Sequence, residues 1–463
     1  MFTKDTYITR REQLKHDVTS GLILLPGNPE ASANYAANTY KFRQDSNFLY
    51  FFGLNEPDYF GVIDVDNNQD WIFANDLDID DIIWMGDLPT VSERAHSVGV
   101  QKTAPLNALR EVIANAIANH RPIHFCNPYR GKVTHLLSQL LQTPYEDLKN
   151  SVSTTLIKAI VKQRSVKSEA EIIEIEKAIE IAYQMQTTAM RMAVNTDYYE
   201  HHIAGCVEGI TLEHDGNVSF PVICSMNGQT LHNHHHHQKL ERGRLLVLDC
   251  GAELPNNYCS DITRTMPVGG RFTDKQKVVY EIVLAAHLKG IELAKPDVLY
   301  RDVHFAACQT IAEGLKQLGL MRGDTQEAVN KGAHALFMPH GLGHMMGLDV
   351  HDMENLGENF VGYDDQTKRS NEFGLGYLRC AKKIHPGFVL TVEPGIYFIP
   401  QLFKLWKQQN KFTEFLNYDK IEQYLDFGGI RIEDDILITD AGCRVLGTPI
   451  PKTVADIESL MNR

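Results

Sequence analysis

The chain has 463 residues and a formal net charge of −14, with 43% hydrophobic and 22% charged residues. These proportions are those of a globular protein of two or three domains. A general nucleic-acid-binding protein is usually basic, and a membrane span needs about eighteen consecutive apolar residues, which the chain lacks. We therefore expect neither nucleic acid nor a membrane among its partners.

The start of the chain, MFTKDTYITRREQLKHD, is charged and lacks the apolar core of a signal peptide. The eight cysteines are irregularly spaced and form no CxxC pair. In a chain of this length such cysteines are typical of reduced core residues. We expect a cytoplasmic protein without a thiolate zinc site.

The first part of the chain is predicted to be an α/β domain. FLYFFGL (Phe48–Leu54) and YFGVIDVD (Tyr59–Asp66) are short runs, apolar or rich in β-forming residues and bounded by turn residues, which favours strands. LNALREVIANAIANH (Leu106–His120) has helical periodicity.

A helix start marks the second domain. Ser168 and Glu171 have the spacing of a capping box, in which each side chain bonds a backbone N–H of the first turn. Apolar residues then recur at helical spacing through Ile181. We place the boundary near residue 160, which gives domains 1–160 and 161–463.

The second domain alternates predicted strands and helices. RLLVLDCGAE, GFVLTVEPGIYF and GIRIEDDILITD predict strands, and FTDKQKVVYEIVLAAHLKGIELA (272–294) is the clearest helix. The pattern predicts an α+β fold, in which helices cover an antiparallel sheet.

The predicted strands carry acids where a core should be apolar. Asp249 ends LLVLD, Glu393 ends VLTVE, Glu433 and Asp434 interrupt IRIEDDILI, and Asp261 follows a turn-like LPNN. An ionised acid there is costly unless it is paired or metal-bound, and each like-charge pair about 4 Å apart costs ~4 kcal/mol. Any one of these acids alone is readily explained as a surface residue at a strand end. Together they suggest a pair of divalent cations.

The segment HGLGHMMGLDVHD supplies His340, His344 and His351. The first two have the spacing of HExxH, but the intervening GLG lacks the glutamate and is poor helix. The glycines instead indicate a tight backbone that aims several side chains into one pocket. Four carboxylates and one imidazole form a hard ligand set that suits manganese or cobalt. Two such ions lower the pKa of a water between them, which is hydrolase chemistry.

Five motifs carry a family resemblance: LVLDCGAE, YCSDITRTMPVGG, PHGLGHMMGLDVHD, LTVEPGIY and IRIEDDILIT. Their order and spacing resemble the proline-specific metallopeptidases of the pita-bread fold, the aminopeptidase P and prolidase family, and most of all the Xaa-Pro aminopeptidases. FRQDSNFLYFFGLNEPD (42–58) resembles the N-terminal domain of the same enzymes. The resemblance implies a creatinase/aminopeptidase P-like α/β domain followed by a pita-bread catalytic domain.

The resemblance also implies a metal centre of two divalent ions. Manganese is preferred, with cobalt or zinc as alternatives. Asp249 would bind one ion, Asp261 and Glu433 would bridge both, and His344 and Glu393 would complete the two coordination spheres.

The remaining roles also follow from the resemblance. Glu393 would move the proton of the attacking water, and His232 and His351 would hydrogen-bond the peptide and its developing oxyanion. His340, His351 and Arg431 would contact the substrate or support the ligand strand.

The implied activity is hydrolysis of the Xaa-Pro bond at the N-terminus of peptides with proline in second position, by a homodimer or homotetramer. The alternative is an Xaa-Pro dipeptidase (prolidase). The 17-residue spacing from His232 to Asp249 favours the aminopeptidase, whereas the 40-residue gap from Glu393 to Glu433 resembles larger prolidases. A remote alternative, a non-catalytic interaction module, is disfavoured because every ligand type is present.

Two segments stay outside this scheme. Residues 401–428 are an insertion that is either a surface elaboration or a part of the cleft or of a dimer contact. In LHNHHHHQK, His232 alone matches a family position. His234–His237 are adjacent residues that point to alternate faces and cannot converge on one ion, so we predict a solvated loop at the rim of the cleft.

Overall fold

The computed structural model describes residues 2–462, which divide into two compact units. The first runs to Arg164 and includes Asn355–Phe360, and the second contains the remaining residues from Ser165 onward. Within residues 2–462, every helix is too short or too polar to cross a lipid bilayer.

The first unit is built on a five-stranded sheet in the order β6-β5-β4-β1-β7. Strand β4 is antiparallel to both of its neighbours, while the two edge strands run parallel to theirs. Helices α5 (Leu109–Ala118) and α6 (Gly131–Leu141) pack their apolar residues against β1 and β4. The predicted strand at 59–66 and the predicted helix at 106–120 are confirmed. The strands are β1 Leu22–Pro26, β4 Phe60–Asp64, β5 Gln69–Phe73, β6 Lys102–Ala104 and β7 Ile123–His124.

The strand predicted at Phe48–Leu54 is wrong, because the structure has helix α2 (Ser46–Phe52) there. The Asp45 side chain caps it by accepting from the N–H groups of Asn47 and Phe48 at 2.9 and 3.0 Å. Gly53 ends the helix at φ 65°, where glycine is favoured. All seven helical residues are buried, so the run is apolar on every face and its period does not distinguish a helix from a strand.

The first unit has further helices and a second, two-stranded sheet. Helix α3 has no buried residue and begins with a capping box made by Asp78 and Asp81. The remaining elements are α1 Lys4–Val18, β2 Ser32–Tyr35, β3 Asn38–Thr39, α3 Ile79–Met85, α4 Val91–Ser97 and α7 Thr154–Ser165.

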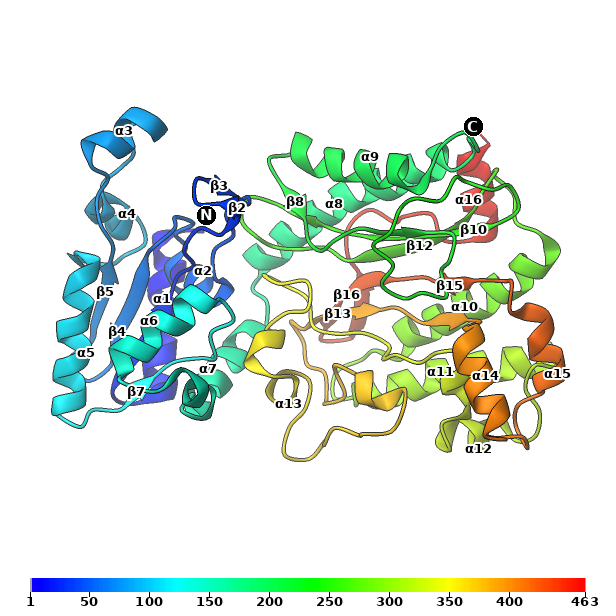
Figure 1. Cartoon of the computed structure of the whole chain (residues 1–463). Coiled ribbons are helices and arrows are strands. Elements are labelled where there is room, and N and C mark those ends of the chain that lie inside the picture. The colour runs from blue at the N-terminus through cyan, green and yellow to red at the C-terminus, as the bar shows by residue number, and fades with distance from the viewer. Residues whose placement is uncertain (1, 463) are drawn as a thin grey trace. The chain divides into compact units, whose positions relative to one another are not determined.

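In the second unit, antiparallel strands lie between two pairs of helices (Figure 1). Helix α8 (Glu169–Met192) begins with the predicted capping box, and with α9 (Glu200–Glu213) it covers the sheet β12-β10-β9. Helices α10 and α11 cover the sheet β13-β16-β17 and the pair β14-β15 (Figure 1). This arrangement confirms the predicted α+β class. The strands are β8 Asn217–Val218, β9 Ile223–Ser225, β10 Leu245–Cys250, β11 Ala252–Glu253, β12 Ile262–Pro267, β13 Val389–Val392, β14 Gly395–Tyr397, β15 Gly429–Arg431, β16 Asp434–Thr439 and β17 Gly442–Val445.

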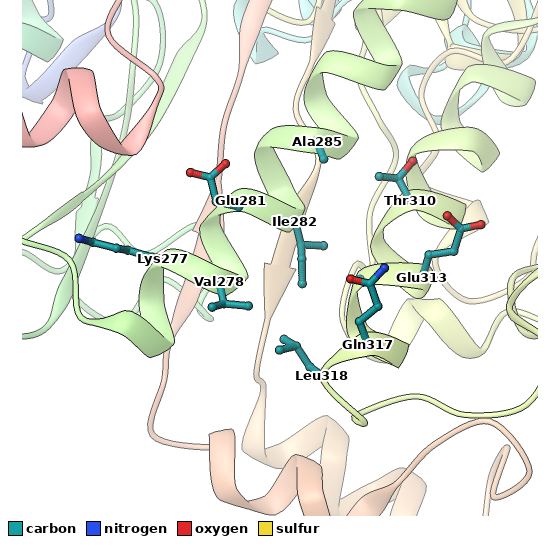
Figure 2. A pocket seen from close by; sticks show the side chains of 10 residues that line it. Lys277, Val278, Glu281, Ile282, Ala285, Thr310, Glu313, Gln317 and Leu318 are labelled. Atoms are coloured by element: carbon teal, nitrogen blue, oxygen red, sulfur yellow. The ribbon is translucent and has the colours of Figure 1, made fainter.

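Helices α10 (Asp274–Leu293) and α11 (Tyr300–Gln317) pack closely at Gly314, where an added Cβ would lie 2.6 Å from Ile282. A surface groove remains between the helices and is lined by side chains of both, Lys277 and Glu313 among them (Figure 2). None of the predicted site residues lines this groove.

The insertion at 401–428 is helical and lies on the surface of the second unit. Several of its apolar residues, including Trp406 and Phe415, are buried, and the Phe415 carbonyl accepts from the Arg322 N–H at 2.8 Å. The Trp406 ring packs against Phe373, with centroids 5.8 Å apart. The insertion contains α14 Pro400–Gln408 and α15 Tyr418–Ile421. The other helices of this part of the chain are α12 Thr325–Asn330, α13 Glu358–Val361 and α16 Val454–Met461.

Candidate metal centre

Two pairs of strands bring four acids together. In the first pair Asp249 of β10 lies opposite Thr263 of β12, and Asp261 precedes β12 by one residue. An added Cβ on Gly251 would lie 1.8 Å from the carbonyl oxygen of Ser260, so only glycine fits where the two strands close.

The second pair of strands carries the glutamates. Val392 lies opposite Asp434 and Gly395 lies opposite Arg431, all in one antiparallel register. Glu393 and Glu433 occupy the positions between these partners. The register therefore places the two glutamates side by side.

His344 joins the acids because its segment runs along β13. The Thr391 N–H donates to the His344 carbonyl at 3.0 Å, and the Glu393 N–H donates to that of Leu342 at 2.8 Å. An added Cβ on Gly343 would lie 2.0 Å from the Thr391 carbonyl oxygen. The glycines of HGLGH therefore permit a close approach of two backbones, as the sequence indicated.

The five predicted ligands form two overlapping groups of donor atoms. In one, single atoms of Asp249, Asp261 and Glu433 lie within 4.8 Å of one another, and in the other the atoms belong to His344, Glu393 and Glu433. Glu433 is shared by both groups, as expected of a bridging ligand. A nitrogen of His351 also lies within 4.8 Å of atoms of Asp261 and His344.

The hydrogen bonds of His344 fix its tautomer. Nδ1 lies 3.0 Å from the Met345 carbonyl, so it carries the proton and donates it. Nε2 then holds a lone pair, 3.4 Å from Asp261 Oδ2 and 3.9 Å from Glu393 Oε1. A neutral imidazole whose Nδ1 is anchored in this way, with Nε2 left free, is a usual form of a histidine metal ligand.

The acids repel one another strongly. Burial and the nearby Glu433 carboxylate raise the pKa of Asp261 well above its usual value. Burial, together with Glu393 and Asp249, does the same to the pKa of Glu433. Burial also raises the pKa of Glu393 to about 7, against the opposing charge of Arg431.

Two buried carboxylate oxygens of this set, Asp249 Oδ1 and Asp261 Oδ1, have no hydrogen-bond partner among the described residues. A buried, unpaired ionic oxygen is expensive. Orphaned oxygens, like-charge repulsion and hard donor atoms together fit a pair of divalent cations.

Arg431 ties the acids to their supporting strands. Its Nη2 donates to Asp249 Oδ2 at 2.6 Å, its Nε to Thr263 Oγ1 at 3.0 Å, and its Nη1 to the Tyr397 hydroxyl at 3.0 Å. The Thr263 hydroxyl in turn donates to Glu433 Oε2 at 2.7 Å. Arg431 therefore links Asp249 to Tyr397 and, through Thr263, to Glu433.

The third predicted pocket histidine, His340, is held by a tyrosine that the sequence did not reveal. Nδ1 lies 2.7 Å from the Gly341 carbonyl and Nε2 lies 2.9 Å from the Tyr397 hydroxyl. Burial, with the charge of Arg431, lowers the pKa of His340 to about 3. The ring is therefore neutral, with Nδ1 donating and Nε2 accepting from Tyr397.

His351 is oriented by two further residues that sequence reasoning missed. Its Nδ1 lies 2.6 Å from Glu354 Oε2, and Arg379 Nη1 lies 2.9 Å from Glu354 Oε1. The hydrogen bond from His351 lowers the pKa of Glu354 to about 2. Glu354 stands three residues after His351, and this spacing is the signal that could have found it.

All nine predicted site residues line one cavity of about 690 Å³. His232 lies in its wall, where partial burial and the Arg431 charge lower the pKa of the imidazole. His234 lines the cavity as well, and like His235 and His237 it is exposed. The predicted solvated loop at the rim of the cleft is therefore confirmed for these three residues, whereas His236 is half-buried, with Nε2 3.0 Å from the Val222 carbonyl.

Buried carboxylates, one anchored imidazole and a lined cavity define a metal-dependent hydrolase. Residues 174–440 match the sequence family described as "Metallopeptidase family M24", and residues 7–124 match "Aminopeptidase P, N-terminal domain". The chain therefore belongs to metallopeptidase family M24, and the resemblance seen in its five motifs is confirmed.

Curated relatives of the chain carry two activity names. It is 32% identical to the Xaa-Pro dipeptidase of Homo sapiens over 457 residues, covering 96% of this chain and 89% of that protein. It is 30% identical over 465 residues to the "Probable Xaa-Pro aminopeptidase pepP" of Aspergillus clavatus, covering 98% and 95% of the two chains.

Solved structures agree with the fold. Aminopeptidase PepP of Pseudomonas aeruginosa superposes with a TM-score of 0.82 at 25% identity, covering 100% of this chain and 98% of that one. Zn-substituted Escherichia coli aminopeptidase P, in complex with product, gives 0.81 at 26% identity, with 100% and 99% covered. The chain thus has a pita-bread catalytic part preceded by an aminopeptidase P-type N-terminal part.

Proposed function

We propose that the chain is an Xaa-Pro aminopeptidase, which removes the first residue of peptides whose second residue is proline. The observation that supports this most is the cavity of about 690 Å³ lined by all nine predicted site residues. A volume in the range of drug-sized binding sites has room for a peptide longer than two residues.

We propose that Asp249, Asp261, His344, Glu393 and Glu433 hold two divalent cations. The donor set of mostly carboxylate oxygens favours Mn²⁺, with Co²⁺ or Zn²⁺ as alternatives. When bound, the cations neutralise the acids and make a water nucleophilic at neutral pH.

The chain's own residues then transfer protons and orient the peptide. Glu393 accepts the proton of the attacking water and passes it to the proline nitrogen, which leaves as an amine. His351, anchored through Nδ1 to Glu354, presents Nε2 to the peptide oxygen, and His232 does so from another part of the wall. Neutral His340 contacts the peptide beside them.

Recognition of proline requires an apolar surface, because the imide nitrogen has no N–H to bind. The cavity wall supplies apolar and aromatic side chains for the ring. The Trp406 ring supports one of them, Phe373, so the insertion contributes to the shape of the wall. Among these side chains are Phe220, Ile223, Leu231, Val350, Phe373 and Tyr377.

The second candidate is an Xaa-Pro dipeptidase. The Arg379 guanidinium is on the cavity wall, where it is able to pair with the terminal carboxylate of a dipeptide. The relationship to the human Xaa-Pro dipeptidase supports this candidate as well.

The two candidates differ in the length of substrate. An aminopeptidase hydrolyses Xaa-Pro-Xaa tripeptides at least as fast as Xaa-Pro dipeptides, whereas a dipeptidase cleaves the dipeptide alone. In a dipeptidase, Arg379→Met raises KM for the dipeptide, while the surface substitution Arg301→Met changes nothing. Efficient dipeptide cleavage without tripeptide cleavage contradicts our first choice.

We further propose that the domain boundary lies near residue 160.

We also propose that the chain forms a homodimer or homotetramer. The support for an oligomer is α3, which exposes Ile83 at 69% and Trp84 at 86%. Apolar side chains gathered on one exposed helix are typical of interaction surfaces. Light scattering should show an oligomer that Trp84→Glu weakens, and a monomer in the unmodified protein contradicts the proposal.

A further inference from the structure

A cysteine and two histidines form a buried cluster apart from the cavity. His304 and Cys308 stand one turn apart on α11, and His334 lies in the 3-10 turn η3 (Ala333–Leu336). Their exposed fractions are 1%, 0% and 2%. None of the three lines the cavity.

The donor atoms converge on one point. His304 Nε2 lies 3.5 Å from Cys308 Sγ, and one donor atom from each of the three residues lies within 4.8 Å of the others. Ligands of a single ion at about 2.0–2.3 Å lie roughly 3.3–3.8 Å apart, so a contraction of about 1 Å brings all three into range.

A second observation also indicates a ligand. His334 Nδ1 is buried and has no hydrogen-bond partner among the described residues, although the same ring also has a backbone hydrogen bond with Val329. An unsatisfied buried polar atom costs about 1–3 kcal/mol. A bound ion that accepts its lone pair would remove this cost.

The electrostatics of the cluster restrict the charge of the ion. Burial lowers the pKa of His304 to about 3 and that of His334 to about 4, so both rings are neutral. Burial raises the pKa of the Cys308 thiol far above its usual value. Among the described residues, no carboxylate perturbs the pKa of any of the three.

We propose that His304, Cys308 and His334 form a second metal site that binds one monovalent soft cation, Cu⁺. On binding, the Cys308 S–H bond breaks and its proton leaves to solvent. An S–Cu bond forms, and each histidine donates one nitrogen lone pair without any change of oxidation state. The thiolate and Cu⁺ together are neutral, whereas Zn²⁺ would leave a net positive charge buried without a counterion. Thiolate ligands also favour Cu⁺ by their softness.

An ion at this site would tie α11 to η3, which leads directly into the segment that ends at His340. The sequence led us to expect no thiolate zinc site, because its cysteines are irregularly spaced and form no CxxC pair. His334 is brought to His304 and Cys308 by the fold.

The test uses the full chain, first loaded with Mn²⁺ and then incubated with Cu⁺ under anaerobic, reducing conditions against a chromophoric Cu⁺ chelator. The unmodified protein should take up one Cu⁺ per chain, with one sulfur and two nitrogen neighbours in X-ray absorption. Cys308→Ala should weaken this uptake by at least about 100-fold, since it removes the soft ligand. His334→Gln should weaken it less.

Cys224→Ala, which removes another fully buried thiol, is the matched control and should keep the stoichiometry. Circular dichroism establishes whether each variant is folded. If Cys308→Ala does not fold, His334→Gln serves as the decisive variant. Equal Cu⁺ uptake by the variants and the unmodified protein, or no uptake at all, overturns the site. Tighter Cys308-dependent binding of Zn²⁺ than of Cu⁺ overturns the assignment to a monovalent ion.

Discussion

Glu433 and Asp434 are neighbours in the chain and equally buried, at 2% exposure each, yet their surroundings are opposite. Burial alone would raise the pKa of Asp434, but Arg264, His287 and Lys452 outweigh it and hold this pKa well below its usual value. Arg264 Nη2 donates to Asp434 Oδ1 at 2.6 Å, and Lys452 contacts the other oxygen. Glu433 instead faces Glu393 and Asp249, and its pKa is raised.

The difference separates two kinds of buried acid. Asp434 receives its counterions from the chain, so its network is complete as folded. The acids around Glu433 are four carboxylates that face Arg431 and, through Glu393, Arg379, which is too little positive charge, so they require cations from solution. Asp434 therefore stabilises the fold, whereas the acids around Glu433 form a candidate metal site.

The largest effect is expected from Glu433→Gln, which removes the ligand shared by both donor groups. We expect kcat/KM on an Xaa-Pro peptide to fall at least about 10³-fold, or roughly 4 kcal/mol, with a loss of bound metal. Glu422→Gln, an exposed acid, is the control. Normal turnover by the Glu433 variant would contradict the shared-ligand role.

Asp434→Asn should instead reduce stability, because it leaves the buried Arg264 and the half-buried Lys452 beside a neutral group. We expect the free energy of unfolding in urea to fall by about 3–5 kcal/mol. In metal-free protein, Glu433→Gln should have the opposite sign, since it relieves repulsion. The comparison fails if both substitutions destabilise metal-free protein equally.

The pH dependence of metal-free stability follows from the raised pKa values. The pKa of Glu393 is about 7 in the fold against an ordinary 4.5, so the folded state holds its proton more tightly. The contribution to stability is present below about pH 4.5 and is lost as pH rises to 7, by on the order of 2–3 kcal/mol. Asp261 and Glu433 act in the same direction. Tm of metal-free protein should therefore fall between pH 5 and 8 and recover with Mn²⁺; a Tm that rises with pH would refute this.

Glu354→Gln tests the residue that orients His351. We expect kcat to fall about 10–100-fold, the usual range for a partner that orients an active-site group, with metal content unchanged. Glu372→Gln, an exposed glutamate, should leave kcat unaltered. Loss of metal together with activity would show that Glu354 acts on the metal centre instead.

The smallest effect is expected from His235→Gln combined with His237→Gln, because both rings are exposed and neither lines the cavity. Activity at neutral pH should change less than about twofold, as for other exposed substitutions. A larger loss would mean that the loop contacts substrate.

The sequence singled out four acids because each conflicts with its surroundings, since an acid in an apolar strand needs a physical reason, and the structure brings them together with His344. Glycine at 343 likewise indicated a close backbone approach that the structure shows. Tyr397 was missed because a tyrosine in a strand looks like an ordinary core residue. Arg379 was missed because it meets Glu354 only through the fold, 25 residues further along the chain.

Helix α2 was mispredicted for a related reason. Its residues are buried on every side, so no polar face reveals the helical period of 3.6 residues. The cap at Asp45 was the available signal. Local sequence patterns thus distinguish a helix from a strand where one face is exposed to solvent. They fail where every face is buried.

The central claim is that five side chains, Asp249, Asp261, His344, Glu393 and Glu433, hold two divalent ions. Anomalous scattering at the manganese edge from crystals of the Mn²⁺-loaded protein tests it most directly. Two bound ions should give two peaks about 3.5–4 Å apart among these side chains, and Glu433 should contact both ions. A single peak, or peaks held by other residues, would contradict it.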